Sequence, residues 1–236
     1  MGVLERYPEI EQYLDKTDDY LLDAEEREID GNKFLIVTQR GEFDAGQLLF
    51  QIMDDGLQLR SSDNTVQIDA PIDIADAPAA TVCRISDPED IRRVHEAAVA
   101  AVDTFSSANG PDRGNLACVW AVRHIAFRAL SRWITRTDGT AVFDPELRRC
   151  FGETSQDEQV PAGGIIISPT EGSNIGHVGL LGPHTGNGHR LIYSNSSSAA
   201  MWKQNFTLAS WIARYRDRKG LKVRFYPIPD YVPASG

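Results

Sequence analysis

The chain has 236 residues, 42% of them apolar and 25% charged, so it can bury one substantial core or one core with a smaller partner domain. Its formal charge of −10 argues against a nucleic-acid binder, because phosphate contacts need clustered Lys and Arg and the basic residues here are interspersed with acids. No apolar run reaches membrane-spanning length, and no basic start precedes an apolar stretch. We expect a protein with no membrane span, cytoplasmic as synthesised and without a cleavable signal peptide.

The first 80 residues carry weak structural signals and no chemistry that can be named. An acidic, helical start is followed by a predicted strand over residues 34–38, a helix over 45–53, and weaker strands over 57–60 and 66–68. Residues 69–78 hold two prolines and three acids, which indicates a linker. We therefore expect an N-terminal accessory segment over residues 1–80 and a second domain over residues 81–236.

The second domain begins with two predicted helices. A capping box at 86–89 starts a helix that runs to about Phe105, and the turn-rich stretch 106–115 separates it from a helix over about 116–133. Strands follow over 165–167, 177–181, 190–194 and 221–226, with a helix over 208–219. The predicted fold class is α+β. The buried stripe of the second helix is expected to comprise Val119, Val122, Ala126, Ala129 and Trp133.

The three cysteines, Cys83, Cys118 and Cys150, form a sparse, odd-numbered set with no CxxC spacing. Such a set indicates neither a disulfide framework nor a cysteine zinc site, so we expect free thiols in a reducing compartment. Cys83 and Cys150 are expected to be packing residues, because neither follows a turn at the head of a convincing helix. No cofactor is expected.

Cys118 has a different setting, because it falls in the first turn of the second predicted helix, just after Gly114 and Asn115. Unpaired backbone N–H groups at a helix start favour a thiolate and can hold the oxyanion of a tetrahedral intermediate. The backbone N–H of Cys118 itself is the expected oxyanion donor. Inert packing is the alternative, since a free cysteine is among the most buried residue types.

His177 lies at the entrance to an apolar strand, with Gly176 and Gly179 leaving room for a substrate. The turn over 183–189 is centred on Gly186, which is equidistant from His177 and Asn195. Antiparallel pairing about that centre would make His177 and Asn195 direct cross-strand neighbours on one face. The Asn195 amide oxygen could then fix the imidazole tautomer, although Asn195 could equally begin a turn.

The other histidines are weaker candidates. His124 is six residues after Cys118, about 240° around the helix, so its side chain should point away from the sulfur. His184 and His189 could form a metal site with His177, but no paired carboxylate or familiar ligand spacing supports one, and no metal is expected.

Three short segments in order, 114–122, 176–180 and 192–196, resemble the NlpC-type and CHAP-like cell-wall cysteine peptidases and amidases. The resemblance covers roughly residues 86–229 and implies a papain-like core, in which a cysteine-headed helix packs on a small antiparallel sheet. It implies that Cys118 is the nucleophile, His177 its base and Asn195 the residue that orients the base. The sequence around Cys118 differs from the usual Asp-Cys-Ser-Gly, and Gly164 stands where an acid is frequent.

The resemblance implies a cysteine-dependent hydrolase of peptide or amide bonds in peptidoglycan, used in lysis or as an antibacterial effector exported without a cleavable signal peptide. Its partners would be a peptidoglycan peptide and an immunity or inhibitor protein. Two alternatives stay open: a non-catalytic binding or structural module of the same fold, and a thiol acyltransferase. Residues 1–80 could be a targeting module or a lid. The expected substrate-binding residues are Asn115, Trp120, Gly176, Tyr193 and Trp202.

Overall fold

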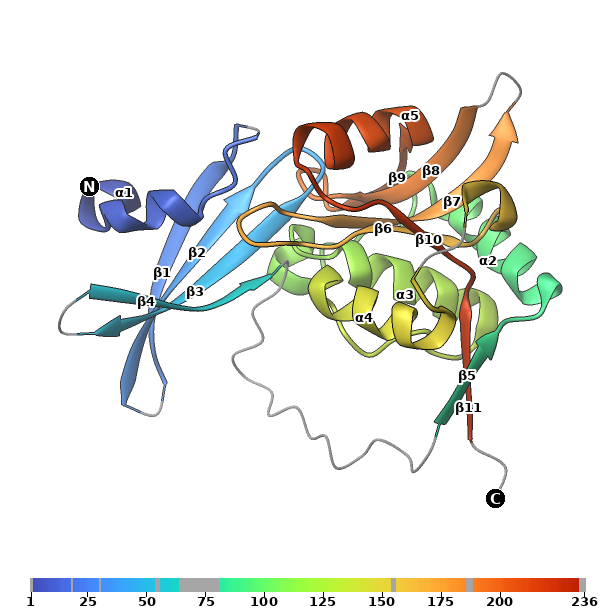
Figure 1. Ribbon diagram of the computed structural model, residues 1–236, viewed down its shortest axis with the longest axis horizontal. Coiled ribbons are helices and arrows are strands. Elements are labelled where there is room, and N and C mark those ends of the chain that lie inside the picture. Colours follow the sequence, from blue (N-terminus) through green and yellow to red (C-terminus); the bar gives the residue numbers. More distant parts are fainter. Residues whose placement is uncertain are drawn as a thin grey trace.

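The computed structural model describes residues 2–17, 19–29, 31–53, 56–63, 81–153, 156–185 and 189–233. Two modules are distinguished by their sheets (Figure 1): an N-terminal module, residues 2–63, and a C-terminal module, residues 81–233. The helices and sheets are mixed and the pairings are antiparallel, so the fold is α+β in general terms. The expected linker over 69–78 and the weak strand over 66–68 lie outside the described residues.

The N-terminal module is an antiparallel four-stranded sheet in the order β1-β2-β3-β4, with two short helices packed against one face. Ile10 and Leu14 pack there against alternate residues of β2 and β3, which form a small core. Its elements are α1 (Val3–Arg6), η1 (Pro8–Tyr13), β1 (Leu21–Ile29), β2 (Asn32–Arg40), β3 (Ala45–Met53) and β4 (Gly56–Asp63).

The helix expected over 45–53 is wrong, because these residues form β3. Leu48 and Phe50 are buried while Gln47, Leu49 and Gln51 are half-buried, which is the two-residue alternation of a strand. Hydrogen bonding to β2 on one side and β4 on the other decides the conformation. Strand β1 was not expected from the sequence. Its charged residues suit an edge strand exposed to water.

The C-terminal module is built on a five-stranded antiparallel sheet in the order β10-β6-β7-β8-β9, called here the central sheet. Helices α2, α3 and α4 cover one face, and α5 with η5 covers the other (Figure 1). Its helices are α2 (Pro88–Ala101), η3 (Pro111–Gly114), α3 (Cys118–Leu130), α4 (Thr140–Phe151), η4 (Asp157–Gln159), α5 (Leu208–Trp211) and η5 (Ile212–Arg218). Its strands are β5 (Thr81–Ile85), β6 (Ile165–Ser168), β7 (His177–Thr185), β8 (His189–Ser196), β9 (Met201–Thr207), β10 (Arg224–Tyr226) and β11 (Pro229–Pro233).

The predicted order of elements in this module holds in outline, with additions. Helix α4 and the strands β5, β9 and β11 were not expected from the sequence. In α4, Pro145 interrupts the helical pattern. Trp133 is not part of the buried stripe: α3 ends at Leu130, Ser131 takes a left-handed conformation, and the Trp133 side chain is 41% exposed.

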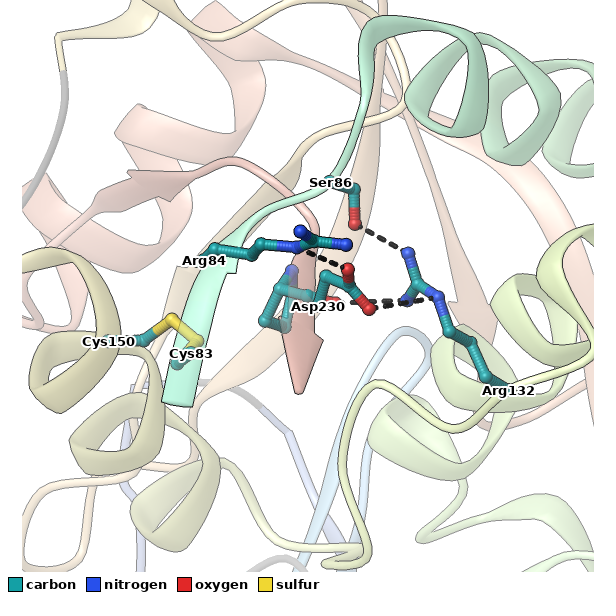
Figure 2. The surroundings of a disulfide bond; sticks show 7 residues. Cys83, Arg84, Ser86, Arg132, Cys150 and Asp230 are labelled. Atoms are coloured by element: carbon teal, nitrogen blue, oxygen red, sulfur yellow. Dashed lines mark hydrogen bonds and ion pairs between the residues drawn. A yellow bond between two sulfur atoms is a disulfide. The ribbon is translucent and has the colours of Figure 1, made fainter. Parts of the chain in front are cut away.

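A disulfide joins Cys83 of β5 to Cys150 near the end of α4, so the expectation of three free thiols is wrong (Figure 2). The two cysteines are 67 residues apart, with Cα atoms 5.4 Å apart, a proximity that only the tertiary structure creates. Beside the disulfide, the carboxylate of Asp230 in β11 forms ion pairs with Arg84 and Arg132. Covalent and ionic contacts thus fasten the β5–β11 pair to the helical layer.

Candidate functional site

Cys118 is the first residue of α3, as expected for a cysteine at a helix start. Its side chain is only 3% exposed and belongs to the core on the helical face of the central sheet, together with Val178 and Leu180 of β7. It is the one cysteine outside the disulfide. The N-terminal end of α3 is a favourable place for a thiolate, but the sulfur is shielded from water in this arrangement.

His177 lies on the opposite face of the central sheet. Its fully buried ring stacks on Trp211 at 5.5 Å and on Tyr215 at 5.9 Å between centroids, and both rings belong to the α5–η5 layer. Successive strand residues point to opposite faces, and Val178 packs on the side of α3. The structure therefore does not bring the His177 ring to the face on which Cys118 packs.

Burial lowers the pKa of His177 to about 4, a shift opposed by the Asp44 carboxylate and reinforced by Arg214 and Lys219. The Asp44, Arg214 and Lys219 side chains all come from the side of the sheet away from Cys118. Neither ring nitrogen has a hydrogen-bond partner of normal geometry among the described residues, although the nearby Asn195 backbone raises the pKa slightly. His177 is thus a neutral, buried imidazole at neutral pH.

The predicted register that made His177 and Asn195 direct neighbours is wrong by one residue. Strands β7 and β8 do pair antiparallel, but next to the turn Thr185 lies opposite His189, two residues from the expected register. The bulge between Leu181 and His184 recovers one of these residues, so that Gly179 lies opposite Ser194. A shift of one residue moves a side chain to the other face of the sheet. Asn195 accordingly faces the helical layer, where its Nδ2 donates to the Gly114 carbonyl oxygen at 2.9 Å.

Three of the expected substrate-binding residues do not line a groove. Trp202 is fully buried, with its indole N–H donating to the Ala98 carbonyl at 3.0 Å, and Tyr193 belongs to the same core. Gly176 leaves no space for a substrate, because a Cβ there would lie 2.1 Å from the Ser168 carbonyl oxygen. These residues are explained by packing.

The other two expected substrate-binding residues lie closer to open surface. Trp120 is half-buried and its ring lies 3.9 Å from that of His124, whose Nδ1 is 2.8 Å from the Trp120 carbonyl oxygen. Asn115 lies in the loop before α3 and lines a cleft of about 600 Å³ between the two modules. The side walls of that cleft are Asp23, Ala24, Glu25, Arg27, Ile36, Thr38, Arg40 and Gln47 from the N-terminal sheet and Pro111, Asp112, Arg113, Asn115 and Leu116 from the C-terminal module.

The loop wall of this cleft has an unusual backbone. Asp112 and Arg113 have φ values of 47° and 55°, and Gly114 has 97°, so three consecutive residues are left-handed. This conformation costs about 1–2 kcal/mol for each residue other than glycine. The surrounding bonds maintain it: the Asn115 amide donates to the Asp112 carbonyl at 2.9 Å, and Asn195 holds Gly114. Strain of this kind clusters at functional sites.

The opposite wall of the cleft is the charged face of the N-terminal sheet. Arg40 donates from Nε and Nη2 to the Asp112 carboxylate at 3.2 Å and so connects the two walls. Glu25 and Arg27 pair with each other along β1. Sequence reasoning missed this wall, although charged residues at every second position of 23–27 were a usable signal for a polar strand face.

Among the described residues, no helix is both long enough and apolar enough to cross a membrane. Comparisons with protein-family models, with curated proteins and with solved structures found no match to this chain.

Proposed function

We propose that this protein binds short peptides carrying both positive and negative charges, and that the cleft between its two modules is the binding site. The observation that supports the proposal is the pairing of a mixed-charge sheet face with a left-handed loop across about 600 Å³. A cavity of this size suits a small ligand, and convergent polar groups would fix its orientation. This function is the binding-module alternative left open by the sequence, with a peptidoglycan stem peptide as a suitable ligand.

Two features favour binding over hydrolysis. Cys118 is almost fully buried, and His177 packs on the other face of the central sheet. A general base must come within hydrogen-bond reach of the proton that it removes. Arg40, Asp112 and Asn115, in contrast, present polar groups directly at the cleft.

Isothermal titration with a soluble peptidoglycan stem peptide, which carries carboxylates and an amine, tests the proposal. We expect saturable binding to the wild type and at least tenfold weaker binding to Arg40→Ala, because a hydrogen bond to a charged group contributes about 1.5–3 kcal/mol. Arg216→Ala, which removes an arginine that has a 59% exposed side chain and does not line the cleft, is the matched control and should bind normally. No binding to the wild type, or equal binding to Arg40→Ala, would refute the cleft as the site.

A second candidate function is the cysteine-dependent amide hydrolase implied by the NlpC-like resemblance, with its papain-like core. It is favoured by the position of Cys118 at the head of α3 and by Asn195 on the same face of the sheet. His177 would take the Cys118 proton, and the thiolate would attack the carbonyl carbon while the Cys118 N–H holds the oxyanion. The C–N bond would then break as His177 returns the proton to the leaving amine, and water would hydrolyse the thioester to a carboxylic acid and the free thiol. For His177 to act as base, its ring would have to leave the stack with Trp211.

Limiting iodoacetamide at pH 6 tests this second candidate on a single thiol, because Cys83 and Cys150 are joined. Rapid alkylation that is lost in His177→Ala, together with peptidoglycan turnover that is lost in Cys118→Ala, would favour the hydrolase. Slow alkylation without turnover would eliminate it. A thiol acyltransferase would be distinguished by transfer of the acyl group to an added amine instead of water.

The disulfide also bears on where the protein acts. Disulfides persist in oxidising compartments and are rare in the cytosol. The Cys83–Cys150 bond therefore supports a site of action outside the reducing cytoplasm.

A further inference from the structure

Asp44 lies in the turn between β2 and β3, at the tip of a hairpin of the N-terminal module. A turn aspartate is ordinarily exposed, but the Asp44 side chain is completely buried in the C-terminal module. Burying a carboxylate is costly unless charged and hydrogen-bonding partners compensate. The partners of Asp44 therefore define a pocket.

That pocket supplies four donors to one carboxylate. Oδ2 accepts from the Tyr215 hydroxyl at 3.0 Å and from Lys219 Nζ at 3.2 Å, while Oδ1 accepts from the Tyr20 hydroxyl at 2.8 Å. Arg214 Nη2 lies 3.5 Å from both carboxylate oxygens. Three of these donors, Tyr215, Lys219 and Arg214, belong to the C-terminal module.

Both cations of the pocket, Lys219 and Arg214, contact Asp44. Lys219 also pairs with the buried Asp15 at 3.0 Å, so two aspartates face two cations. Burial raises the pKa of Asp44, but Lys219 and Arg214 more than offset this and hold it below its ordinary value. Removing the Asp44 carboxylate would take away the anion that Lys219 and Arg214 share.

The His177 ring gives a second, independent indication of a ligand site. It is fully buried, neither of its nitrogens has a hydrogen-bond partner of normal geometry among the described residues although the Asn195 backbone lies near the ring, and Asp44 is the charged group that most affects its pKa. Buried polar atoms are rarely left without partners, and those that are need an explanation. An occupant with more polar atoms than one aspartate side chain could satisfy them.

The tip of the β2–β3 hairpin contacts the C-terminal module in the way that a bound peptide segment would. The Ser198 hydroxyl donates to the Glu42 carbonyl at 3.0 Å. The Ser197 hydroxyl, which donates to the Asn115 carbonyl at 2.7 Å, also lies 3.3 Å from the Phe43 carbonyl oxygen. The Phe43 ring packs on Phe206 at 5.0 Å between centroids. The C-terminal module thus contacts three consecutive residues, Glu42, Phe43 and Asp44, through backbone carbonyls, an aromatic ring and a carboxylate.

We propose that the C-terminal module has a carboxylate-binding pocket, formed by Arg214, Tyr215 and Lys219 beside His177, which Asp44 fills as an internal ligand. The ligand class is a peptide segment that presents an aspartyl side chain or a terminal carboxylate. The pocket is separate from the cleft between the modules, and the inference does not depend on the proposed function.

Chemical rescue of full-length Asp44→Ala with acetate tests the pocket. At constant ionic strength, acetate should raise the Tm of Asp44→Ala saturably, by about 4 °C at ten times its Kd, and chloride should not. The wild type and Asp44→Ala with Lys219→Met should not respond. Asp144→Ala is the matched control, because Asp144 is another buried aspartate with arginine partners.

No saturable rise in Asp44→Ala, or an equal rise in Asp144→Ala, would overturn the proposal. If Asp44→Ala does not fold, hydrogen exchange of the wild type replaces it, with the blocked tetrapeptide Glu-Phe-Asp-Ala as the probe. The peptide should accelerate exchange at amides 41–46 by displacing the hairpin tip, whereas its Asp→Asn analogue should not. Equal exchange with both peptides would also overturn the proposal.

Discussion

Two ionic junctions join distant parts of this chain, and they differ in their exposure to water. The junction around Lys219 is dry: the side chains of Lys219, Asp15 and Asp44 are all completely buried. The junction around Asp230, which Figure 2 shows, is wet. The Arg84 side chain is 63% exposed, although the Asp230 side chain is only 12% exposed. The first joins the two modules, and the second holds β11 against β5 beside the disulfide.

Similar ionic contacts therefore contribute differently to the stability of the fold at the two junctions. At the wet junction, water can replace a lost partner, so an individual ion pair contributes little and the Cys83–Cys150 bond provides most of the attachment. At the dry junction, water cannot enter to solvate a charge that has lost its partner. The dry junction should therefore be the more vulnerable to substitution.

The largest effect is expected for Lys219→Met, which removes the cation that the buried Asp15 and Asp44 share and leaves Asp44 with Arg214 at 3.5 Å. Breaking a buried ion pair by removing one partner costs about 3–5 kcal/mol. Urea denaturation should show this loss in the free energy of unfolding. Lys222→Met, an exposed neighbour, is the control, and equal losses in the two variants would mean that the junction is not dry.

A loss of similar size is expected when the disulfide is removed by the double substitution Cys83→Ser and Cys150→Ser. The bond closes a loop of 67 residues, and chain-entropy arguments assign such a loop about 4 kcal/mol. Denaturation of the oxidised wild type and of the double variant measures the difference. If the variant is as stable as the wild type, the wet junction holds β5 and β11 without covalent help.

A somewhat smaller effect is expected from acid. The unfolded chain binds a proton at His177 near pH 6.5, whereas burial lowers the pKa in the folded protein to about 4. Stability is therefore full above pH 6.5 and falls by roughly 3 kcal/mol as the pH decreases to about 4. Loss of the aspartate contacts follows at lower pH, because the pKa values of Asp15 and Asp44 are lowered.

His177→Phe keeps the ring stack and removes the titrating group, so it should flatten the dependence of stability on pH between 6.5 and 4. A slope from His95 and His124 should remain, because partial burial also lowers their pKa values. Denaturation midpoints across this pH range provide the measurement. An unchanged slope in His177→Phe would show that His177 is not the buried neutral group described above.

The smallest effect is expected for Arg84→Ala at the wet junction. The Arg84 guanidinium is exposed, although its bond with Asp230 raises its pKa, and Asp230 keeps Arg132 as a second partner. The free energy of unfolding should be unchanged within error, at both low and high salt. A measurable, salt-dependent loss would mean that the two junctions are more alike than their exposure indicates.

Short-range patterns predicted much of the C-terminal module. The strand over 165–167, the helix headed by Cys118 and the antiparallel pairing of β7 with β8 follow from apolar periodicity and turn residues. The candidate site was less predictable, because face and register decide it. Next to the turn the strands pair two residues from the expected register and the bulge between Leu181 and His184 recovers only one, while His177 faces the aromatic layer instead of Cys118.

By itself the sequence determined the α+β class, the position of Cys118 at a helix start, and which residues form the neighbouring strands β7 and β8. Only the tertiary structure decided that 45–53 is a strand, that Cys83 meets Cys150, and that Asp44 is buried beside Lys219. Periodicity records which residues prefer burial within one element. Partners that are 67 or 175 residues apart in the chain leave no local pattern, because their contact depends on how whole sheets and helices pack.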